Sequence, residues 1–252
     1  MRLSSSLAMS LDPVILAEQA GITPDPWQAT VLRSVARQVL MLCSRQAGKS
    51  TTAGLLAVDE AIHRESLVLL LAAALRQSSE LFRSVKAILR ALGDYAPPIV
   101  QESALSLELA NGARIVSLPG TEGTIRGFSK VALLVIDEGA RVRDDLYQSV
   151  RPMLSVSRGR LVALSTPFGR RGWFHHEATS GTEDWERVRV TAYDVPRISR
   201  EWLEAERNRI GDWWFRQEYL CEFVDTEDQV FSHDLVMAAM RDDVAPLFPV
   251  AA

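Results

Sequence analysis

A short apolar run that leads directly into a Gly-Lys-Ser turn limits the fold of this chain more than any other feature. The run, Val39–Cys43, is too short for a helix and is typical of a buried strand. Residues 44–51 follow it and read Ser-Arg-Gln-Ala-Gly-Lys-Ser-Thr, and a helical pattern then extends from Lys49 to about His63. A strand, a loop containing glycine and a helix in this order predict a loop whose backbone amides and helix N-terminus face phosphate groups.

Further apolar runs alternate with helical patterns along the chain. Leu75–Leu92 has the period of a helix, and three more apolar runs predict buried strands: Leu67–Leu71, Val131–Ile136 and Leu161–Leu164. Strands that alternate with helices predict an α/β fold with a mainly parallel central sheet flanked by helices. Residues Ile99–Ser117 instead alternate between apolar and polar and contain an Asn-Gly pair, which predicts an antiparallel addition to the sheet.

The same patterns divide the chain into four segments. Residues 1–23 are predicted to form an N-terminal arm, frayed or lightly docked over Met1–Pro13. Residues 24–180 form the α/β core, which opens with a short helix over Trp27–Gln38. We expect a small lid subdomain over residues 181–223, with a strand at Arg187–Thr191 and helices at Ser199–Arg209 and Asp212–Leu220. Residues 224–252 carry acids, prolines and small apolar residues, which is typical of a linker or tail.

Composition narrows the class of protein. The chain has 252 residues and a net charge of -4, which argues against a protein that coats nucleic acid by bulk positive charge. No apolar run approaches the roughly 20 residues of a membrane helix, so we expect no membrane association and a location in the cytoplasm. Cys43 and Cys221 lack the spacing of a zinc site or a disulfide framework, and the histidines show no metal-binding pattern.

The predicted phosphate loop has the chemistry to bind a nucleotide. Gly48 lets the backbone approach the phosphates, Lys49 reaches the β and γ oxygens, and Ser50 offers a hydroxyl group to Mg²⁺. Cys43 occupies the position at which the full pattern has its first glycine, so a helix N-terminus with a surface lysine remains the alternative. The residues expected to contact the nucleotide are Ser44, Arg45, Gln46, Ala47, Gly48, Lys49, Ser50 and Thr51.

Two acids follow an entirely apolar predicted strand. Asp137 and Glu138 come directly after Val131–Ile136, at the carboxyl end of the strand, where ligands bind in parallel sheets. Asp137 is expected to hold Mg²⁺ through water, and Glu138 to orient and deprotonate an attacking water as a catalytic base. An acidic helix cap is the alternative for the pair. The phosphate loop and the acids, each at a strand's end and in this order, together predict ATP hydrolysis.

These motifs resemble those of the large terminase family of tailed bacteriophages, whose ATPase is a P-loop NTPase of the RecA-like, additional-strand class. Residues 45–50 are similar to the family's phosphate loop, which tolerates loss of the first glycine and carries arginine at the position of Arg45. Residues 26–28, Pro-Trp-Gln, resemble the family's glutamine motif on the adenine side. The resemblance therefore implies that Gln28 reads the adenine edge.

Two further segments match the family. Residues 124–128, Thr-Ile-Arg-Gly-Phe, resemble the segment that supplies an arginine to a neighbouring subunit's ATP, so Arg126 is the candidate arginine finger, acting in trans. A loop arginine paired with Glu122 is the alternative. Residues 164–169, Leu-Ser-Thr-Pro-Phe-Gly, resemble the coupling motif that senses the γ-phosphate, with Ser165 and Thr166 as its hydrogen-bonding residues.

The resemblance covers about Pro24–Phe223 and implies an ATP-hydrolysing motor domain that moves double-stranded DNA into a prohead without reading its sequence. It implies ATP and Mg²⁺ as cofactors, and the prohead portal and the small terminase subunit as partners. The implied assembly is a homo-oligomeric ring in the cytoplasm of an infected bacterial host, with a monomer as the alternative for the isolated chain. The family continues into a nuclease domain that this chain does not reach, so we expect no DNA cleavage.

Two other functions remain open from the sequence. The first is a helicase-like or repair ATPase that acts on DNA, although the length after Phe223 is too small for the second RecA-like domain that helicases usually need. The second is a nucleotide-binding regulatory module without turnover, against which Glu138 argues. For DNA contact, the arginines near the acidic strand are the candidates: Arg141, Arg143, Arg151, Arg158 and Arg160.

Overall fold

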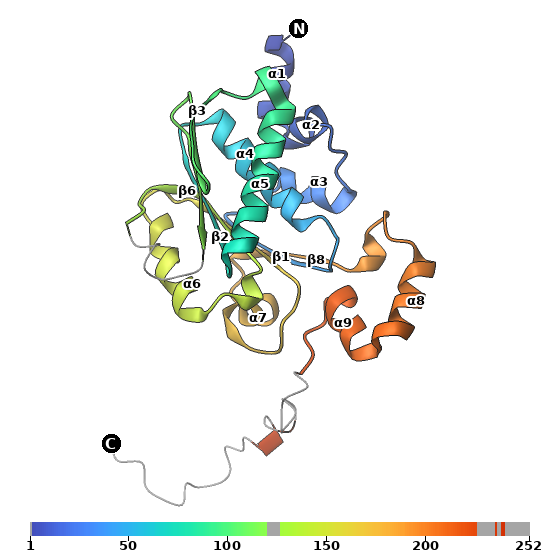
Figure 1. Ribbon diagram of the computed structural model, residues 1–252. Coiled ribbons are helices and arrows are strands. Elements are labelled where there is room, and N and C mark those ends of the chain that lie inside the picture. The colour runs from blue at the N-terminus through green and yellow to red at the C-terminus, as the bar shows by residue number, and fades with distance from the viewer. Residues whose placement is uncertain (1, 120–126, 226–234, 236–237, 240–252) are drawn as a thin grey trace, which may run out of the picture.

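A computed structural model describes residues 2–119, 127–225, 235 and 238–239 of the chain (Figure 1). Its centre is a sheet with these strands: β1 (Gln38–Cys43), β2 (Leu67–Ala72), β3 (Ile99–Glu102), β4 (Ser106–Leu109), β5 (Arg114–Pro119), β6 (Val131–Asp137), β7 (Arg160–Ser165) and β8 (Trp185–Val190). They lie in the order β3-β4-β5-β2-β6-β7-β1-β8. All neighbouring pairs from β5 to β8 in this order are parallel, which confirms the predicted mainly parallel sheet.

The antiparallel addition predicted for Ile99–Ser117 is confirmed. β3 pairs antiparallel with β4, and β4 pairs antiparallel with β5. In the turn between β4 and β5, the side-chain amide of Asn111 donates to the carbonyl of Ala61 at 2.9 Å, and Gly112 has a φ of 83°. The positive φ favours glycine, which explains why an Asn-Gly pair marks this turn.

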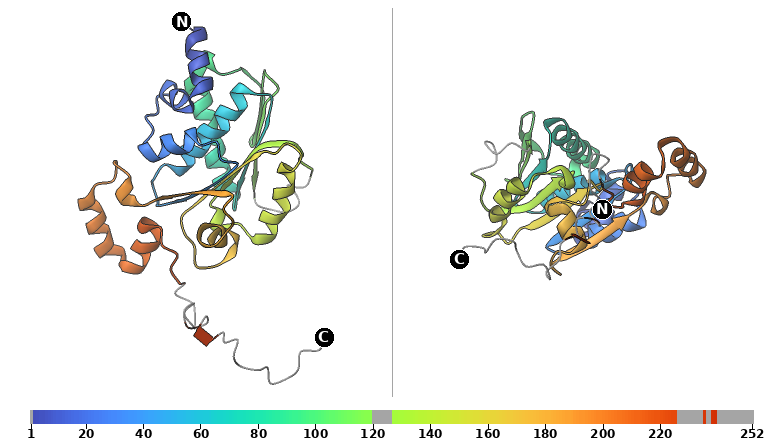
Figure 2. Two further views of the ribbon diagram at one scale, coloured as in Figure 1. Left: turned by 180° about the vertical axis from the view of Figure 1, so that it is seen from behind. Right: turned by 90° about the horizontal axis from the view of Figure 1, so that it is seen from below.

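Helices cover both faces of the sheet (Figures 1 and 2). One face packs against α2 (Pro13–Gln19), α3 (Pro26–Arg33), α4 (Lys49–His63) and α5 (Leu75–Leu92), and the other against α6 (Asp144–Val150) and α7 (Gly172–Thr179). Along β1, Val39 and Met41 belong to the first hydrophobic cluster, whereas Leu40 and Leu42 belong to the second. This division follows because successive side chains of a strand point to opposite faces.

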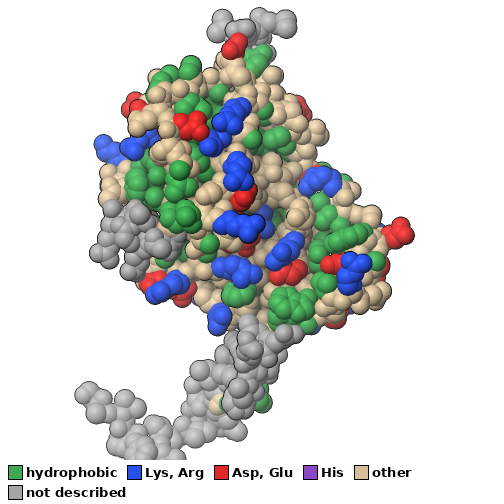
Figure 3. Space-filling view, in the orientation of Figure 1, with side chains coloured by type: hydrophobic (Ala, Val, Ile, Leu, Met, Phe, Trp, Pro, Cys, Tyr) green, Lys and Arg blue, Asp and Glu red, His purple; other side chains and the backbone are tan. Residues whose placement is uncertain are grey.

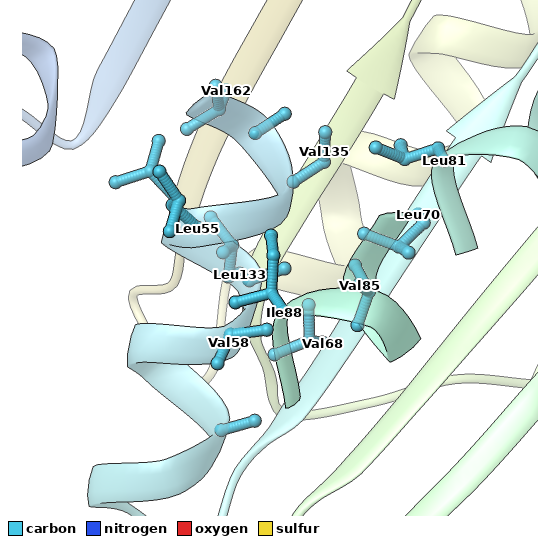
Figure 4. Packing of buried hydrophobic residues seen from close by; sticks show 14 of the residues in the cluster. Leu55, Val58, Val68, Leu70, Leu81, Val85, Ile88, Leu133, Val135 and Val162 are labelled. Carbon is cyan, nitrogen blue, oxygen red and sulfur yellow. The ribbon is translucent and has the colours of Figure 1, made fainter. Parts of the chain in front are cut away.

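The packing of the first face holds α4 and α5 against the sheet. Figure 4 shows the contributing side chains, which come from α4 (Leu55, Val58), α5 (Leu81, Val85, Ile88), β2 (Val68, Leu70), β6 (Leu133, Val135) and β7 (Val162). Each of them is at most 3% exposed. Full burial of one such side chain contributes about 1.5–3 kcal/mol, so this packing holds the middle of both helices firmly against the sheet.

The N-terminal residues differ from the predicted frayed or lightly docked arm. They form two helices, α1 (Arg2–Leu11) and α2, and Met9 and Leu16 are buried in the main hydrophobic cluster. The carboxylate of Asp12 caps α2 by accepting from the amide of Val14 at 3.0 Å, and a proline occupies the first helical position. With seven residues, α2 is too short to show an apolar period in the sequence.

Two element boundaries also differ from prediction. α3 ends at Arg33 rather than Gln38, because Ser34 has an extended backbone and residue 38 already belongs to β1. β8 pairs in parallel with β1, so residues 185–190 are part of the central sheet rather than of the predicted lid. The helical part of the predicted lid therefore begins after Val190.

The two helices predicted after β8 are confirmed as α8 (Arg200–Ile210) and α9 (Asp212–Leu220). They lie beside the sheet rather than over one of its faces (Figures 1 and 2). Ser199 caps α8 by accepting from the amide of Trp202 at 3.1 Å. Most of the predicted tail, 224–252, falls outside the described residues. Within the described part of the chain, no helix is long and apolar enough to cross a membrane.

Candidate active site

The carboxyl ends of three adjacent strands bring the predicted motifs together. β7 lies between β1 and β6 in the sheet. Leu42 of β1 is paired with Ser165 of β7, and Leu164 of β7 with Asp137 of β6. The phosphate loop follows β1 directly, so the loop, Ser165 and the acids at the end of β6 lie at one edge of the sheet, as predicted.

The backbone of the phosphate loop explains its glycine. Gln46 and Gly48 both have a positive φ, of 59° and 94°, and Gly48 directly precedes the first residue of α4. A Cβ atom at Gly48 would lie 2.8 Å from Nε2 of Gln28, closer than van der Waals contact allows. The loop therefore requires glycine at position 48. The backbone amides of the first turn of α4 can bind phosphate, as at other helix N-termini.

Cys43 stands where the full phosphate-loop pattern has its first glycine. It is the last residue of β1 and is fully buried, and this burial raises the pKa of its thiol. Because the chain is still in the strand at this position, the loop turns only later, at Gln46 and Gly48. The conformation of this loop thus does not need a glycine at position 43.

Lys49, Glu138 and Ser165 form one contact group. Nζ of Lys49 lies 3.3 Å from Oε1 of Glu138, and the two side chains are only 12% and 18% exposed. Oγ of Ser165 donates to Oε2 of Glu138 at 3.3 Å and accepts from the amide of Ala140 at 3.2 Å. Glu138 has a φ of 51°, in the left-handed region that costs free energy for a residue with a side chain. The turn after β6 is therefore strained at the residue that meets Lys49.

Asp137 is buried beside this group, with 6% of its surface exposed. Its pKa is raised to about 6, first because burial disfavours the charged form and second because the carboxylate of Glu138 is near. The amide of Glu138 donates to Oδ1 of Asp137 at 2.9 Å. A cleft of about 420 Å³ opens next to the two acids and is lined by Ser50, Arg76, Gln77, Glu80, Leu81, Asp137 and Glu138.

The oxygen groups in this cleft fit Mg²⁺. The hydroxyl of Ser50 and the carboxylate of Asp137 line the same space, and both are oxygen ligands of the kind that Mg²⁺ prefers. A divalent cation beside Asp137 would favour the charged form of a carboxyl group whose pKa burial raises. The hydroxyl of Ser50 and the carboxylate of Asp137 therefore suit a divalent cation.

Gln28 packs against the end of the phosphate loop and the first turn of α4. Its side chain is 4% exposed, and Nε2 donates to the carbonyl of Gly48 at 3.2 Å and to Oγ of Thr52 at 3.0 Å. Oε1 accepts from the amide of Asp25 at 2.8 Å, because Gln28 reaches back over the first turn of α3. Both ends of the amide thus contact the protein in this structure. The geometry thus indicates that Gln28 supports the loop, and its role at the adenine edge stays a prediction.

One ion pair joins α9 to the phosphate loop, and one hydrogen bond joins the segment before α8 to the same loop. The guanidinium of Arg45 contacts the carboxylate of Glu218 on α9, and the amide of Arg45 donates to the carbonyl of Glu218 at 3.0 Å. Arg197, which precedes α8, donates to Asp25 at 2.5 Å and to the carbonyl of Ala47 at 3.2 Å. The sequence did not single out Glu218, Arg197 or Asp25, because each partner lies 150 or more residues away along the chain.

The remaining predicted residues are placed as follows. Ser44 is fully buried at the start of the loop, and Thr51 is half-buried on the first turn of α4. Thr166 is 4% exposed and directly follows β7, next to Ser165. Arg126 and its alternative partner Glu122 lie outside the described residues.

A sequence model of the family described as "Terminase large subunit, T4likevirus-type, N-terminal" matches residues 40–236. The chain belongs to this family. The matched range contains the phosphate loop, the acids after β6 and both lid helices. The resemblance drawn from the motifs is thereby confirmed.

The terminase chain is similar to the large terminase subunits of several phages. It is 28% identical over 251 residues to that of Thermus virus P23-45 and 26% identical over 230 residues to that of Escherichia phage T5. These matches cover 85% and 86% of this chain but 52% and 51% of the relatives. The chain thus spans about half the length of the curated relatives it matches.

Solved terminase structures have the same fold. The large terminase ATPase domain of Thermus phage P74-26 matches with a TM-score of 0.74 at 26% identity, over 82% of this chain and 97% of that one. The large terminase of a thermophilic bacteriophage in complex with ADP matches with a TM-score of 0.67 at 17% identity, over 80% of this chain and 54% of that one, and indicates the fold alone. The predicted α/β fold of a P-loop NTPase is confirmed.

In this terminase chain, the arginines predicted to contact DNA do not share one surface. Arg141 and Arg143 follow β6 at the edge that carries Glu138. Arg158 and Arg160 lie at the amino end of β7 and line a separate cavity of about 740 Å³. Arg158 and Arg160 therefore lie near the beginning of β6 and away from Asp137 and Glu138, because β6 and β7 run parallel.

Proposed function

We propose that this chain is the ATP-hydrolysing motor domain of a phage large terminase and that it moves double-stranded DNA into a prohead. The observation that carries the proposal is the contact of Lys49 with Glu138 beside the buried carboxyl group of Asp137. At one edge of the sheet, the amine of Lys49 can thus bind phosphate, the carboxylate of Glu138 can activate water and the carboxylate of Asp137 can hold a metal ion. Membership of the terminase family supports the same function.

ATP and Glu138 compete for the amine of Lys49 in this proposal. A triphosphate carries more negative charge than a carboxylate, so its β and γ oxygens attract Lys49 away from Oε1 of Glu138. Glu138 keeps the hydroxyl of Ser165 on its other oxygen. The oxygen that Lys49 leaves then accepts the proton of the attacking water. Binding of ATP therefore prepares the base.

We propose Mg²⁺ as the cofactor of this cleft. Ser50 and Asp137 would hold the ion, Asp137 through water, and the bound ion would neutralise charge on the phosphate oxygens. Asp137 binds a cation only as the carboxylate, so its raised pKa ties metal affinity to pH. Below a pH of about 6, protons compete with the ion for this group.

The lid helices are proposed to follow the state of the phosphate loop. Arg45 carries the contact with Glu218 of α9, and Arg197 holds the carbonyl of Ala47. A shift of the loop backbone on hydrolysis would change both contacts and move α8 and α9 relative to the sheet. Ser165 and Thr166 would relay the loss of the γ-phosphate from the end of β7.

We propose that Arg126 acts across subunits in a homo-oligomeric ring. The support is the resemblance of residues 124–128 to the family segment that supplies an arginine to a neighbour's ATP. A guanidinium that reaches the γ-phosphate would offset the negative charge that develops during transfer. The prohead portal and the small terminase subunit are the further partners that this assembly would meet.

The outward face of α5 carries a row of arginines that could bind DNA. Arg76, Arg83 and Arg90 are exposed and recur at every seventh position, which places them on one side of the helix. Figure 3 shows Lys and Arg side chains gathered along this helix. Arg83 pairs with the exposed Glu80 at 2.8 Å, and Arg90 makes no ion pair with the described residues. We propose that these arginines bind DNA phosphates without reading the base sequence.

Phosphate release by the chain tests this function. It is measured with ATP and Mg²⁺ at several protein concentrations, with and without double-stranded DNA. We expect turnover that DNA stimulates and a rate per molecule that rises with concentration, because a neighbouring subunit completes the site. Folded protein that releases no phosphate under any of these conditions would contradict the ATPase assignment. A rate that DNA leaves unchanged would contradict the DNA contact.

A further inference from the structure

Gln77 is a polar residue of the cleft that the chemistry above does not use. Its side chain lines the cleft together with Ser50, Asp137 and Glu138. Its Oε1 is buried and has no hydrogen-bond partner among the residues that the structure describes. Buried amide oxygens in proteins are normally hydrogen-bonded. Because this oxygen is covered, it meets a molecule in the cleft only when the amide turns about the last bond of the side chain.

The start of α5 is held firmly, which fixes Gln77 in the cleft wall. Ser78 is fully buried, and its carbonyl and Oγ accept from Oγ of Ser117 at 2.9 and 3.1 Å. Leu81 is 1% exposed and packs in the same cluster as Leu70 of β2 (Figure 4). Residues 77 and 81 are four apart and share one side of the helix. The backbone at Gln77 is thus positioned before any substrate arrives, and only the amide has to turn toward the cleft.

The other side chains that α5 places in this wall are less suited to bind a water molecule. Arg76 and Glu80 are both exposed, and Glu80 pairs with Arg83 at 2.8 Å. Leu81 is apolar. Gln77 combines a buried oxygen, which accepts a hydrogen bond, with an amide nitrogen, which donates one. An amide does not titrate, so it can orient a water molecule without competing for its proton.

We infer that the amide of Gln77 hydrogen-bonds the water that attacks the γ-phosphate, as a partner of Glu138. Oε1 accepts from the water, and Nε2 donates to an oxygen of the γ-phosphate. In the step, the water oxygen forms a bond to the γ-phosphorus, the bond from phosphorus to the terminal oxygen of ADP breaks, and the proton passes to Glu138. This inference rests on the proposed ATPase function and adds one contact to it.

The first test separates chemistry from binding. Gln77→Leu keeps the approximate size of the side chain and removes the amide. We expect kcat to fall about 10- to 100-fold, with KM for ATP within about threefold of the wild type, because the lost contact forms only with the attacking water. Gln148→Leu, on the exposed face of α6, is the control and should change neither value. A purely structural role would instead lower Tm and raise KM together.

The second test needs no turnover. ADP with aluminium fluoride mimics the planar phosphoryl group and recruits a water molecule. Wild-type protein should bind this complex more tightly than ADP alone, and Gln77→Leu should lose about tenfold of the preference while its affinity for ADP stays the same. Wild-type kcat, or an unchanged preference, in Gln77→Leu would overturn the inference and leave the ATPase proposal in place. A wild-type protein with neither turnover nor preference would overturn both.

Discussion

The amine of Lys49 lies 3.3 Å from the carboxylate of Glu138, so the residue proposed to hold phosphate and the residue proposed to activate water neutralise each other. Both side chains are largely buried, and each reduces the cost of keeping the other's charge there. Removing either residue therefore disturbs its partner as well. Variants that keep the shape of the side chain are needed to separate binding of ATP from its hydrolysis.

Glu138→Gln should bind ATP with nearly wild-type affinity and lose turnover by about 10²- to 10⁴-fold, because a neutral amide cannot accept the proton of the attacking water. The amide retains an oxygen for the hydroxyl of Ser165. Binding is measured by titration calorimetry and turnover by phosphate release. The exposed Glu183→Gln serves as the control and should behave as wild type. Steady phosphate release by Glu138→Gln would remove the assignment of Glu138 as the base.

Asp137→Asn should raise the thermal stability of the chain at neutral and higher pH. The pKa of Asp137 is about 6 in the folded chain against 3.8 for the free side chain. Between these values the folded state binds a proton that the unfolded state has released, so stability is greatest at low pH and is lost as the pH rises through about 6. Asparagine avoids this loss and keeps an oxygen for the amide of Glu138.

The measurement is the Tm of both proteins between a pH of about 4 and about 8, with a chelator present. The raised pKa corresponds to about 1–3 kcal/mol, so Asp137→Asn should melt a few degrees higher at pH 8. The difference should become small near pH 4, because the folded chain still holds the proton and the unfolded chain holds it about half of the time. A variant that melts below the wild type at pH 8 would show that the buried carboxylate stabilises the fold.

The sequence predicted the sheet well where local pattern and tertiary environment agree. β1, β2, β6 and β7 are buried on both faces, so their apolar runs stand out without knowledge of the fold. α4 begins at Lys49 and ends at His63, as expected, because the glycine turn and the apolar period mark both limits. α2 was missed because its burial depends on packing against other helices and leaves little trace in seven residues.

The sequence predicted the residues of the site that belong to motifs, but not the residues that hold the phosphate loop in place. Lys49, Asp137 and Glu138 follow strands in motifs that carry their own chemistry. Arg197 and Glu218 act through partners that are distant in the sequence, so no local pattern marks them. The glutamine motif predicted a contact with adenine and did not predict the capping contact of Gln28, in which a glutamine at the third position of a helix satisfies that helix's own first turn.

Mixing two inactive variants tests the action of Arg126 across subunits. Arg126→Ala lacks the finger, and Lys49→Ala lacks the phosphate contact. In a mixed ring, a site with an intact Lys49 meets an intact Arg126 from its neighbour, so phosphate release should recover to a fraction of the wild-type rate. The control variant is Arg114→Ala, which removes an exposed arginine on β5. Unlike Arg126→Ala, it should release phosphate without a second variant. Mixed assemblies, verified by mass photometry, that stay inactive would assign Arg126 to its own subunit.

The arginines of α5 are tested by their effect on stimulation by DNA. The double variant Arg83→Gln with Arg90→Gln removes two exposed positive charges and leaves the cleft residues in place. We expect the concentration of DNA needed for half-maximal stimulation to rise about tenfold, the rate without DNA to stay the same, and the dependence of binding on salt to weaken. Arg114→Gln provides the matched control on β5. An unchanged response to DNA would exclude this face of α5.

The most direct measurement is a structure of Glu138→Gln bound to ATP and Mg²⁺. We predict that the triphosphate lies over residues 44–50, with the amine of Lys49 at the β and γ oxygens and with Ser50 and Asp137 beside the metal ion. A nucleotide bound elsewhere on the chain, or a triphosphate in the loop with Asp137 and residue 138 turned away from it, would contradict the proposed site.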